Sequence, residues 1–296
     1  NIVYSGATKG WTPVSDIVSA LEPVAPPTQR ALFGYGATSG GKISVTNLVS
    51  SSGVVAADVT GVGTARGDLA AAGYGSDKAI FGYGRTGSNL SMTNLVNNSG
   101  VVAADTTGVG TARWGLGAAN YGTDKAIFGY GTTGSNSALT NLVSSSGVVA
   151  SDTAGVGTAR YYTAGVSYGE DKAIFGYGYN GGNLSLTNLV SNLGVVSADV
   201  TGVGTARGYL AAASYGTDKG IFGYGYTGSN LSMTNLVSNT GVVASDVSGV
   251  GTARRQLAAA GYGGDKAIFA YGASSGNQNM SNLVNNSGVV SADVTG

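Results

Sequence analysis

Residues 64–110 read TARGDLAAAGYGSDKAIFGYGRTGSNLSMTNLVNNSGVVAADTTGVG, and this stretch decides the fold because it recurs along the chain. The arginine of its TAR triplet returns every 47 residues, at Arg66, Arg113, Arg160, Arg207 and Arg254. The asparagine of a (T/S)NLV motif keeps the same spacing, at Asn47, Asn94, Asn141, Asn188, Asn235 and Asn282. A fixed period of roughly 20 to 50 residues is typical of solenoids and propellers. The sequence therefore predicts six copies of one supersecondary unit.

The composition excludes several classes of function. The chain has 15 basic and 15 acidic side chains and a net charge of zero, so no basic surface is available to neutralise nucleic-acid phosphates. It contains no cysteine and no histidine, which removes disulfides, thiolate nucleophiles, imidazole bases and the usual zinc and haem ligands. We therefore expect no cofactor and no metal.

The two ends of the chain differ from the repeats. Residues 1–29 form an N-terminal leader in which Ile2–Tyr4 suggests a short strand, whereas residues 30–296 hold the six repeats. The start lacks a methionine and a signal pattern, so a processed chain and a fragment of a longer polypeptide explain it equally well. No apolar run approaches the roughly 18 to 20 residues that span a bilayer.

Each repeat shows four short strand signals separated by turn residues. In the second repeat these are residues 69–74, 78–83, 90–96 and 101–104. Glycine, asparagine, serine and aspartate between them are typical of tight turns, so the pattern predicts an antiparallel β meander.

Six such units predict an all-β fold, a six-bladed β-propeller built from 47-residue four-stranded repeats. Stacking the sheets around an axis buries their faces and leaves only short edges. A linear β-solenoid is the alternative. There are six second, third and fourth strands but five standard first strands, so we expect the leader to supply the sixth and close the ring.

The order of these features resembles a kelch-type propeller blade. An arginine (Arg66) opens the first strand, AIFGYG at residues 79–84 forms a hydrophobic second strand ending in glycines, and a long link leads to the next arginine. The match covers about residues 30–296, but the adjacent glycine pair and the tryptophan of kelch repeats are missing. The wording KAIFGYG…TNLVSNTGVVA…GVGTAR is also similar to repeats in structural proteins of marine tailed bacteriophages. That resemblance implies a virion part such as a tail fibre, appendage or capsid decoration.

The charged residues of the repeat are interpreted as scaffold. One aspartate per repeat, in the series that starts at Asp58, supplies too few oxygens for calcium, so we expect each to cap its own turn. The Asp–Lys pairs are expected at hairpin turns, and the TAR arginines are expected to bond carbonyl groups between blades. Among the acids outside the repeat pattern, Asp68 and Glu170 are predicted at opposite ends of a blade, which makes a paired-carboxylate glycosidase a distant alternative.

The repeats differ most at two positions, the pair after each TAR arginine and the pair after each second strand. In a meander both positions emerge on one face, whereas the nearly uniform turns share the other. Aromatic side chains gather there and are the predicted ligand-binding residues: Trp114, Tyr161, Tyr162, Tyr179, Tyr209 and Tyr226. Unconstrained drift of exposed loops is the competing interpretation.

We therefore predict a non-enzymatic structural or adhesive module of a virus particle, located in the virion or extracellularly. Its expected partners are other virion proteins and a host-surface glycan or protein, contacted by adhesion or receptor binding. The alternative is a lectin-like adhesin that binds carbohydrate through the aromatic face. No catalytic residue is predicted.

Overall fold

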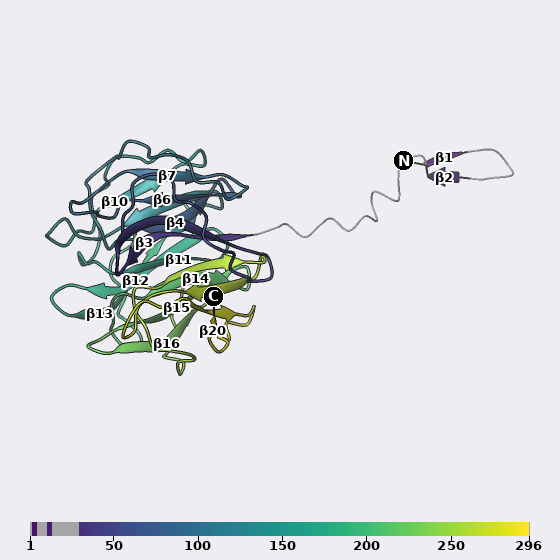
Figure 1. Ribbon diagram of the computed structural model, residues 1–296. Coiled ribbons are helices and arrows are strands. Elements are labelled where there is room, and N and C mark those ends of the chain that lie inside the picture. Colours follow the sequence, from purple (N-terminus) through teal and green to yellow (C-terminus); the bar gives the residue numbers. More distant parts are fainter. Residues whose placement is uncertain (1, 5–10, 14–29, 296) are drawn as a thin grey trace.

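The computed structural model describes residues 2–4, 11–13 and 30–295, and this part of the chain is all-β, with no helix. The strands form a series of small antiparallel sheets of two to four strands, none of which closes on itself (Figure 1). The all-β prediction is confirmed. Because the described part has no helix, it has none long and apolar enough to cross a membrane.

Each repeat forms one sheet, and we number the sheets 1 to 6 along the chain. Sheets 1, 2 and 3 consist of β3 (Ala31–Thr38) and β4 (Gly41–Val49), then β5 (Ala70–Tyr74), β6 (Lys78–Gly82) and β7 (Thr93–Val96), then β8 (Gly117–Tyr121), β9 (Lys125–Gly129) and β10 (Thr140–Val143). Sheets 4 and 5 consist of β11 (Ala164–Tyr168), β12 (Lys172–Tyr179) and β13 (Asn183–Val190), then β14 (Ala211–Tyr215), β15 (Lys219–Tyr226) and β16 (Asn230–Val237). Sheet 6 consists of β17 (Ala258–Tyr262), β18 (Lys266–Ala270), β19 (Met280–Val284) and β20 (Val294–Thr295).

The leader is described only in part. Its strands β1 (Ile2–Tyr4) and β2 (Trp11–Pro13) pair antiparallel, which confirms the short strand expected at the N-terminus. The leader, residues 1–29, is predicted to supply the ring-closing first strand, but its residues 5–10 and 14–29 lie outside the described residues.

The fourth strand is less regular than the sequence predicts. In sheet 2, residues 101–106 pair with β7 through two separate bridges, Val96 with Val102 and Thr93 with Thr106, instead of one continuous strand. The side chains give a reason: Val102 is buried but Val101 is 60% exposed, so the outer segment is packed on one side only. A regular fourth strand is present in sheet 6 as β20, which is two residues long.

The Gly-Tyr-Gly motif makes a bulge that shapes the contact between neighbouring sheets. Its tyrosine has a φ of 63° to 65° in all six repeats, and the β12–β13 register shifts there, between Gly176 and Gly178. The first glycine is needed because a Cβ on Gly176 would stand 2.7 Å from Cζ of Phe222 in the next sheet. Sheet 6 has Ala270 at this position.

Consecutive sheets pack through their first strands, because β5 contacts β8, β8 contacts β11, β11 contacts β14 and β14 contacts β17. Sheet 6 also contacts sheet 1, since β17 packs on β3. The junction of sheets 6 and 1 has the same close glycine contact as other junctions. A Cβ on Gly263 would lie 2.8 Å from the Ser51 carbonyl oxygen, and a Cβ on Gly75 would lie 2.9 Å from the Ser145 carbonyl oxygen at the junction of sheets 2 and 3. In Figure 1 the purple sheet 1 lies between the blue early repeats and the yellow last repeat.

The TAR arginines form the buried polar centre of each repeat. Arg160 has 0% exposure, and its guanidinium donates to the Tyr177 carbonyl (2.7 Å), the Thr158 carbonyl (3.1 Å) and Asn188 Oδ1 (2.7 Å). It also lies 4.1 Å above the ring of Tyr130 from the preceding sheet. The contact between sheets is therefore made by the stacked guanidinium, while the carbonyl bonds stay within the repeat and the link before it.

The repeat aspartates do not cap their own turns, which corrects the sequence interpretation. Asp199 accepts hydrogen bonds from the backbone nitrogen (3.0 Å) and hydroxyl (2.7 Å) of Thr158, which is 41 residues earlier. It also accepts one from Asn188 Nδ2 at 2.9 Å and lies 3.9 Å from Arg160 Nη1. From Asp105 onward, each repeat aspartate therefore ties its repeat to the link before it. A short motif cannot reveal this tie because the partner is so distant in sequence.

Candidate functional site

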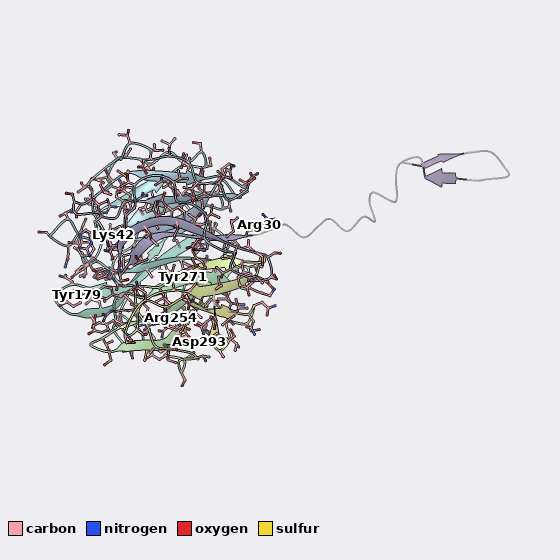
Figure 2. All side chains as sticks on the ribbon, viewed as in Figure 1. Arg30, Lys42, Tyr179, Arg254, Tyr271 and Asp293 are labelled. Carbon is pink, nitrogen blue, oxygen red and sulfur yellow. The ribbon has the colours of Figure 1, made fainter. Side chains whose placement is uncertain are left out.

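The two variable positions lie opposite each other in the backbone. Tyr161 exchanges hydrogen bonds with Tyr179 (3.2 and 2.8 Å), and Gly208 does so with Tyr226 (3.1 and 2.9 Å). In each repeat the first and second strands form a hairpin with the Asp–Lys turn at one end. The variable pairs continue this hairpin at its other end. Figure 2 shows Tyr179 and Lys42 on one side of the molecule and Arg30, which precedes β3, on the other. We call the side that carries the variable pairs the variable face.

The structure brings all six predicted aromatic residues into one continuous row. The ring of Trp114 contacts those of Tyr161 and Tyr162, both at 5.4 Å between centroids. Tyr161 continues to Tyr179 at 5.7 Å, and Tyr162 stacks on Tyr209 at 3.5 Å with an interplanar angle of 28°.

Tyr209 then meets Tyr226 at 6.3 Å, so the row spans sheets 3, 4 and 5. All six side chains are partly exposed. They are neither scattered over both faces nor buried between sheets.

An ion pair ends the row on the side of sheet 2. The Arg85 guanidinium lies 3.6 Å above the Trp114 ring, and its Nε donates to Asp68 Oδ2 at 2.7 Å. Lys42 from sheet 1 approaches the same carboxylate at 4.0 Å. Arg85 is thereby held flat on the indole while its charge is balanced.

A second arginine ends the row on the side of sheet 6. Arg255 lies 4.5 Å above the Tyr226 ring. The row therefore has an arginine at each end, and the two arginines differ in their surroundings.

The row stands on a chain of backbone hydrogen bonds that crosses from sheet to sheet. Tyr162 donates to the Gly115 carbonyl (2.6 Å), Tyr209 to that of Tyr162 (3.2 Å) and Gln256 to that of Tyr209 (2.9 Å). Asp68, at the first position of this series, accepts from Gly115 (2.9 Å). All five residues have φ between 52° and 65°, a left-handed conformation that side chains rarely adopt. The backbone therefore fixes the spacing of the aromatic rings.

The hydroxyls of Tyr161 and Tyr162 are neutral hydrogen-bonding groups at physiological pH. Burial raises the pKa of Tyr162 above the ordinary tyrosine value, and its neighbour Tyr209 and the Asp68 carboxylate raise it further. Burial also raises the pKa of Tyr161. The face combines flat apolar rings with protonated hydroxyls, which suits a ligand that has both apolar and hydroxylated surfaces.

The structure places the acidic residues Asp68 and Glu170 at opposite ends of the strands. Asp68 is engaged by Arg85, and Glu170 lies in the turn between β11 and β12, at the opposite end of the strands. The described residues include no group of three or more acids that could hold a metal ion.

Sequence reasoning found the aromatic residues but missed both arginines that end the row. Arg85 and Arg255 occupy the same variable positions as the tyrosines, so the signal was present. The predicted face is defined by aromatic side chains alone, so both arginines fall outside it. Their pairing with particular rings depends on which repeats are neighbours in space.

Comparison of the chain with protein-family models and with curated proteins gives no match. The resemblance to kelch repeats and to phage structural proteins stays a prediction, and the geometry of the variable face carries the functional argument.

Proposed function

We propose that the six sheets are the blades of a closed six-bladed β-propeller. The packing of β17 on β3 supports closure, because a linear solenoid would leave its first and last repeats apart. The close contact of Gly263 with the Ser51 carbonyl also supports closure, because it matches the glycine contacts between consecutive sheets. The expected first strand of blade 1 belongs to the leader.

We further propose that the protein is a non-enzymatic adhesive module that binds a glycan on its variable face. The observation that carries this proposal is the aromatic row, in which residues from Trp114 to Tyr226 gather in one partly exposed surface. Exposed aromatic rings add to the free energy of the unbound protein surface, so a contiguous row of them is typical of a recognition site. Rings of this kind stack on the apolar faces of sugars while their hydroxyls bond the sugar edges.

The other repeats supply conservative substitutions for the test. Tyr162→Gly introduces the residue found at Gly115, and Tyr179→Thr the one found at Thr132. Glycine also fits the left-handed φ of 52° at position 162. The control is Glu170→Thr on the opposite face, where the equivalent positions are Thr123 and Thr217.

Binding is measured on an array of immobilised oligosaccharides, with thermal unfolding as a check of the fold. We expect the double variant to keep its melting temperature and to lose glycan binding by at least about tenfold, which corresponds to about 1.4 kcal/mol. The control variant should bind like the wild type. A wild-type protein that binds no glycan, or a double variant that binds normally, would refute the proposal.

A docking role in a virus particle is a second candidate, favoured by a different surface. One valine per repeat is 60 to 65% exposed, directly after the glycine that ends the turn following the third strand: Val54, Val101, Val148, Val195, Val242 and Val289. Such a series of exposed apolar side chains suits contact with other particle proteins. The location in a virus particle is itself a prediction, made from the resemblance of the repeat sequence to phage structural proteins. Replacing Val148 and Val195 by lysine should abolish copurification with particles while glycan binding persists. Copurification that is unchanged would contradict this role.

A further inference from the structure

Arg255 differs from Arg85 and from the TAR arginines in its charge environment. Arg85 is neutralised by Asp68 at 2.7 Å, and each TAR arginine lies within 4.0 Å of a carboxylate. Within residues 30–295, no carboxylate lies that close to Arg255, and its guanidinium makes no side-chain hydrogen bond there. It is held over the Tyr226 ring with its charge unbalanced.

A second observation marks the same corner of the variable face. Asn230 lies opposite Tyr226 in the strand register, and its buried Oδ1 has no hydrogen-bond donor within the described part of the chain. The equivalent asparagines of two other repeats are held by hydrogen bonds that their Nδ2 donates to the next loop: Asn89 to the Thr133 carbonyl and Asn136 to Asn180 Oδ1. An unpaired buried acceptor is costly and calls for a partner.

The corner is connected through the backbone. Leu231, which follows Asn230, accepts a hydrogen bond from the backbone nitrogen of Arg254 at 3.1 Å, so the two loops that carry Asn230 and Arg255 are in contact. The guanidinium of Arg255, the ring of Tyr226 and the unpaired acceptor of Asn230 therefore lie together at the end of the aromatic row.

We propose that the Tyr226–Arg255–Asn230 corner binds the anionic group of an acidic saccharide, which makes the glycan of the proposed function a uronate or a sulfated sugar. The guanidinium donates two parallel hydrogen bonds to the carboxylate or sulfate, and stacking on Tyr226 holds it in place. Rotation of the Asn230 side-chain amide brings the buried Oδ1 to the surface, where a hydroxyl of the same sugar donates to it. This inference rests on the proposed function, since the aromatic row must hold the rest of the chain.

The charges also orient the saccharide along the row. At the far end the Asp68 carboxylate already occupies the Arg85 guanidinium and lies near Lys42, whereas within the described residues no carboxylate occupies the guanidinium of Arg255. An anionic group is therefore favoured at sheet 6. Because the attraction is between charges at a surface, it weakens as salt is added.

The test uses three immobilised oligosaccharides of one backbone: a neutral β-1,4-glucan, its C6-oxidised glucuronan, and the 6-O-sulfated form. The proteins are the full chain and its variants Arg255→Ala, Arg255→Lys and Asn230→Ala. Arg30→Ala serves as the matched control, because it removes the same charge from the exposed arginine on the opposite side (Figure 2).

We expect the wild type to bind one or both acidic forms about tenfold or more tightly than the glucan. Arg255→Ala should weaken acidic binding by about 10- to 100-fold, the usual effect of losing hydrogen bonds to a charged group, and leave glucan binding unchanged. Arg255→Lys should lose part of the preference for the acidic forms, because lysine keeps the positive charge but cannot donate two parallel hydrogen bonds. Asn230→Ala should weaken all three, and Arg30→Ala should change none.

The two proposals fail separately. Equal wild-type binding of all three oligosaccharides, or a preference that survives in Arg255→Ala, overturns the acidic-saccharide inference while the adhesive function stands. Binding of none of them by the wild type counts against both. Preference for the glucuronan alone assigns a carboxylate, and preference for the sulfated form alone assigns a sulfate.

Discussion

Replacing Arg160 by alanine tests whether the buried arginine holds the repeats together. The substitution removes three hydrogen bonds, to Tyr177, Thr158 and Asn188, together with the stacking of the guanidinium on Tyr130. It also leaves two carbonyl oxygens and one amide oxygen without this donor in a region that the arginine kept dry.

The magnitude follows from these contacts. A hydrogen bond to a charged group is worth about 1.5 to 3 kcal/mol, and breaking a buried charged pair costs about 3 to 5 kcal/mol. The nearby Asp199 stays bonded to Thr158 and Asn188, so the loss of the charge is partly compensated. We expect the free energy of unfolding to fall by about 4 kcal/mol. Arg160→Lys should recover less than half of this, because an ammonium cannot donate along the three directions of the fork.

Urea unfolding followed by tryptophan and tyrosine fluorescence measures this change, with the slope of the transition checked in each variant. Arg255→Ala is the control, since a partly exposed arginine should change stability by no more than about 0.5 kcal/mol. A loss below about 1 kcal/mol for Arg160→Ala would show that the buried network is not what holds neighbouring repeats. Selective loss of glycan binding with native stability would show that the arginine serves the site.

Four further predictions concern stability. Burial alone would raise the pKa of Asp105, but hydrogen bonds from Thr64 and Asn94 lower this pKa from its ordinary value of 3.8. The carboxylate therefore stabilises the fold above that pH, and this stabilisation is lost as the pH falls below it. Acid unfolding should begin in that range, and an unfolding midpoint near pH 6 would contradict this. Burial raises the pKa of Tyr83 from 10.0 to about 12, so the free energy of unfolding should fall as the pH rises from 10 towards 12. The fall should parallel the rise in tyrosinate absorbance. Unfolding well before that absorbance rises would show that ionisation of Tyr83 is not its cause. Gly176→Ala should cost about 1 to 3 kcal/mol in urea unfolding because its Cβ meets a neighbouring ring, and an unchanged midpoint would show that the ring moves aside. Deletion of residues 1–29 should expose a blade edge and cause aggregation or a large drop in melting temperature, whereas a soluble truncate with unchanged melting would favour the solenoid.

The period of 47 residues made the all-β fold predictable. The recurrence of Arg66 and Asn47, the turn residues and the short apolar segments indicate repeated antiparallel sheets without any knowledge of contacts. The outer segment at residues 101–104 was predicted as a strand because alternating valine and alanine favour extension. Its irregularity depends on what packs against it, which a single repeat does not reveal.

The variable face was predictable as a set of positions but not as a surface. Meander topology indicates that Tyr161 and Tyr179 emerge together, and the structure places them opposite each other. The stacking of Tyr162 on Tyr209 depends on left-handed backbone at both residues, which neither the composition nor the spacing indicates. The same holds for Arg255, whose distinction is the charge that is missing from its surroundings.

The aspartate ties make the repeats interchangeable parts. Asp199 bonds Thr158, and the same pair with the same offset joins Asp105 to Thr64 and Asp293 to Thr252, so every junction from the second repeat onward is chemically alike. A repeat can therefore be moved to another place in the chain without redesigning its neighbours. Loops transplanted from the tyrosine-rich fourth repeat into the second would lengthen the aromatic surface on an unchanged frame. Duplication and recombination of near-identical segments could in the same way alter what the face recognises while the scaffold stays constant.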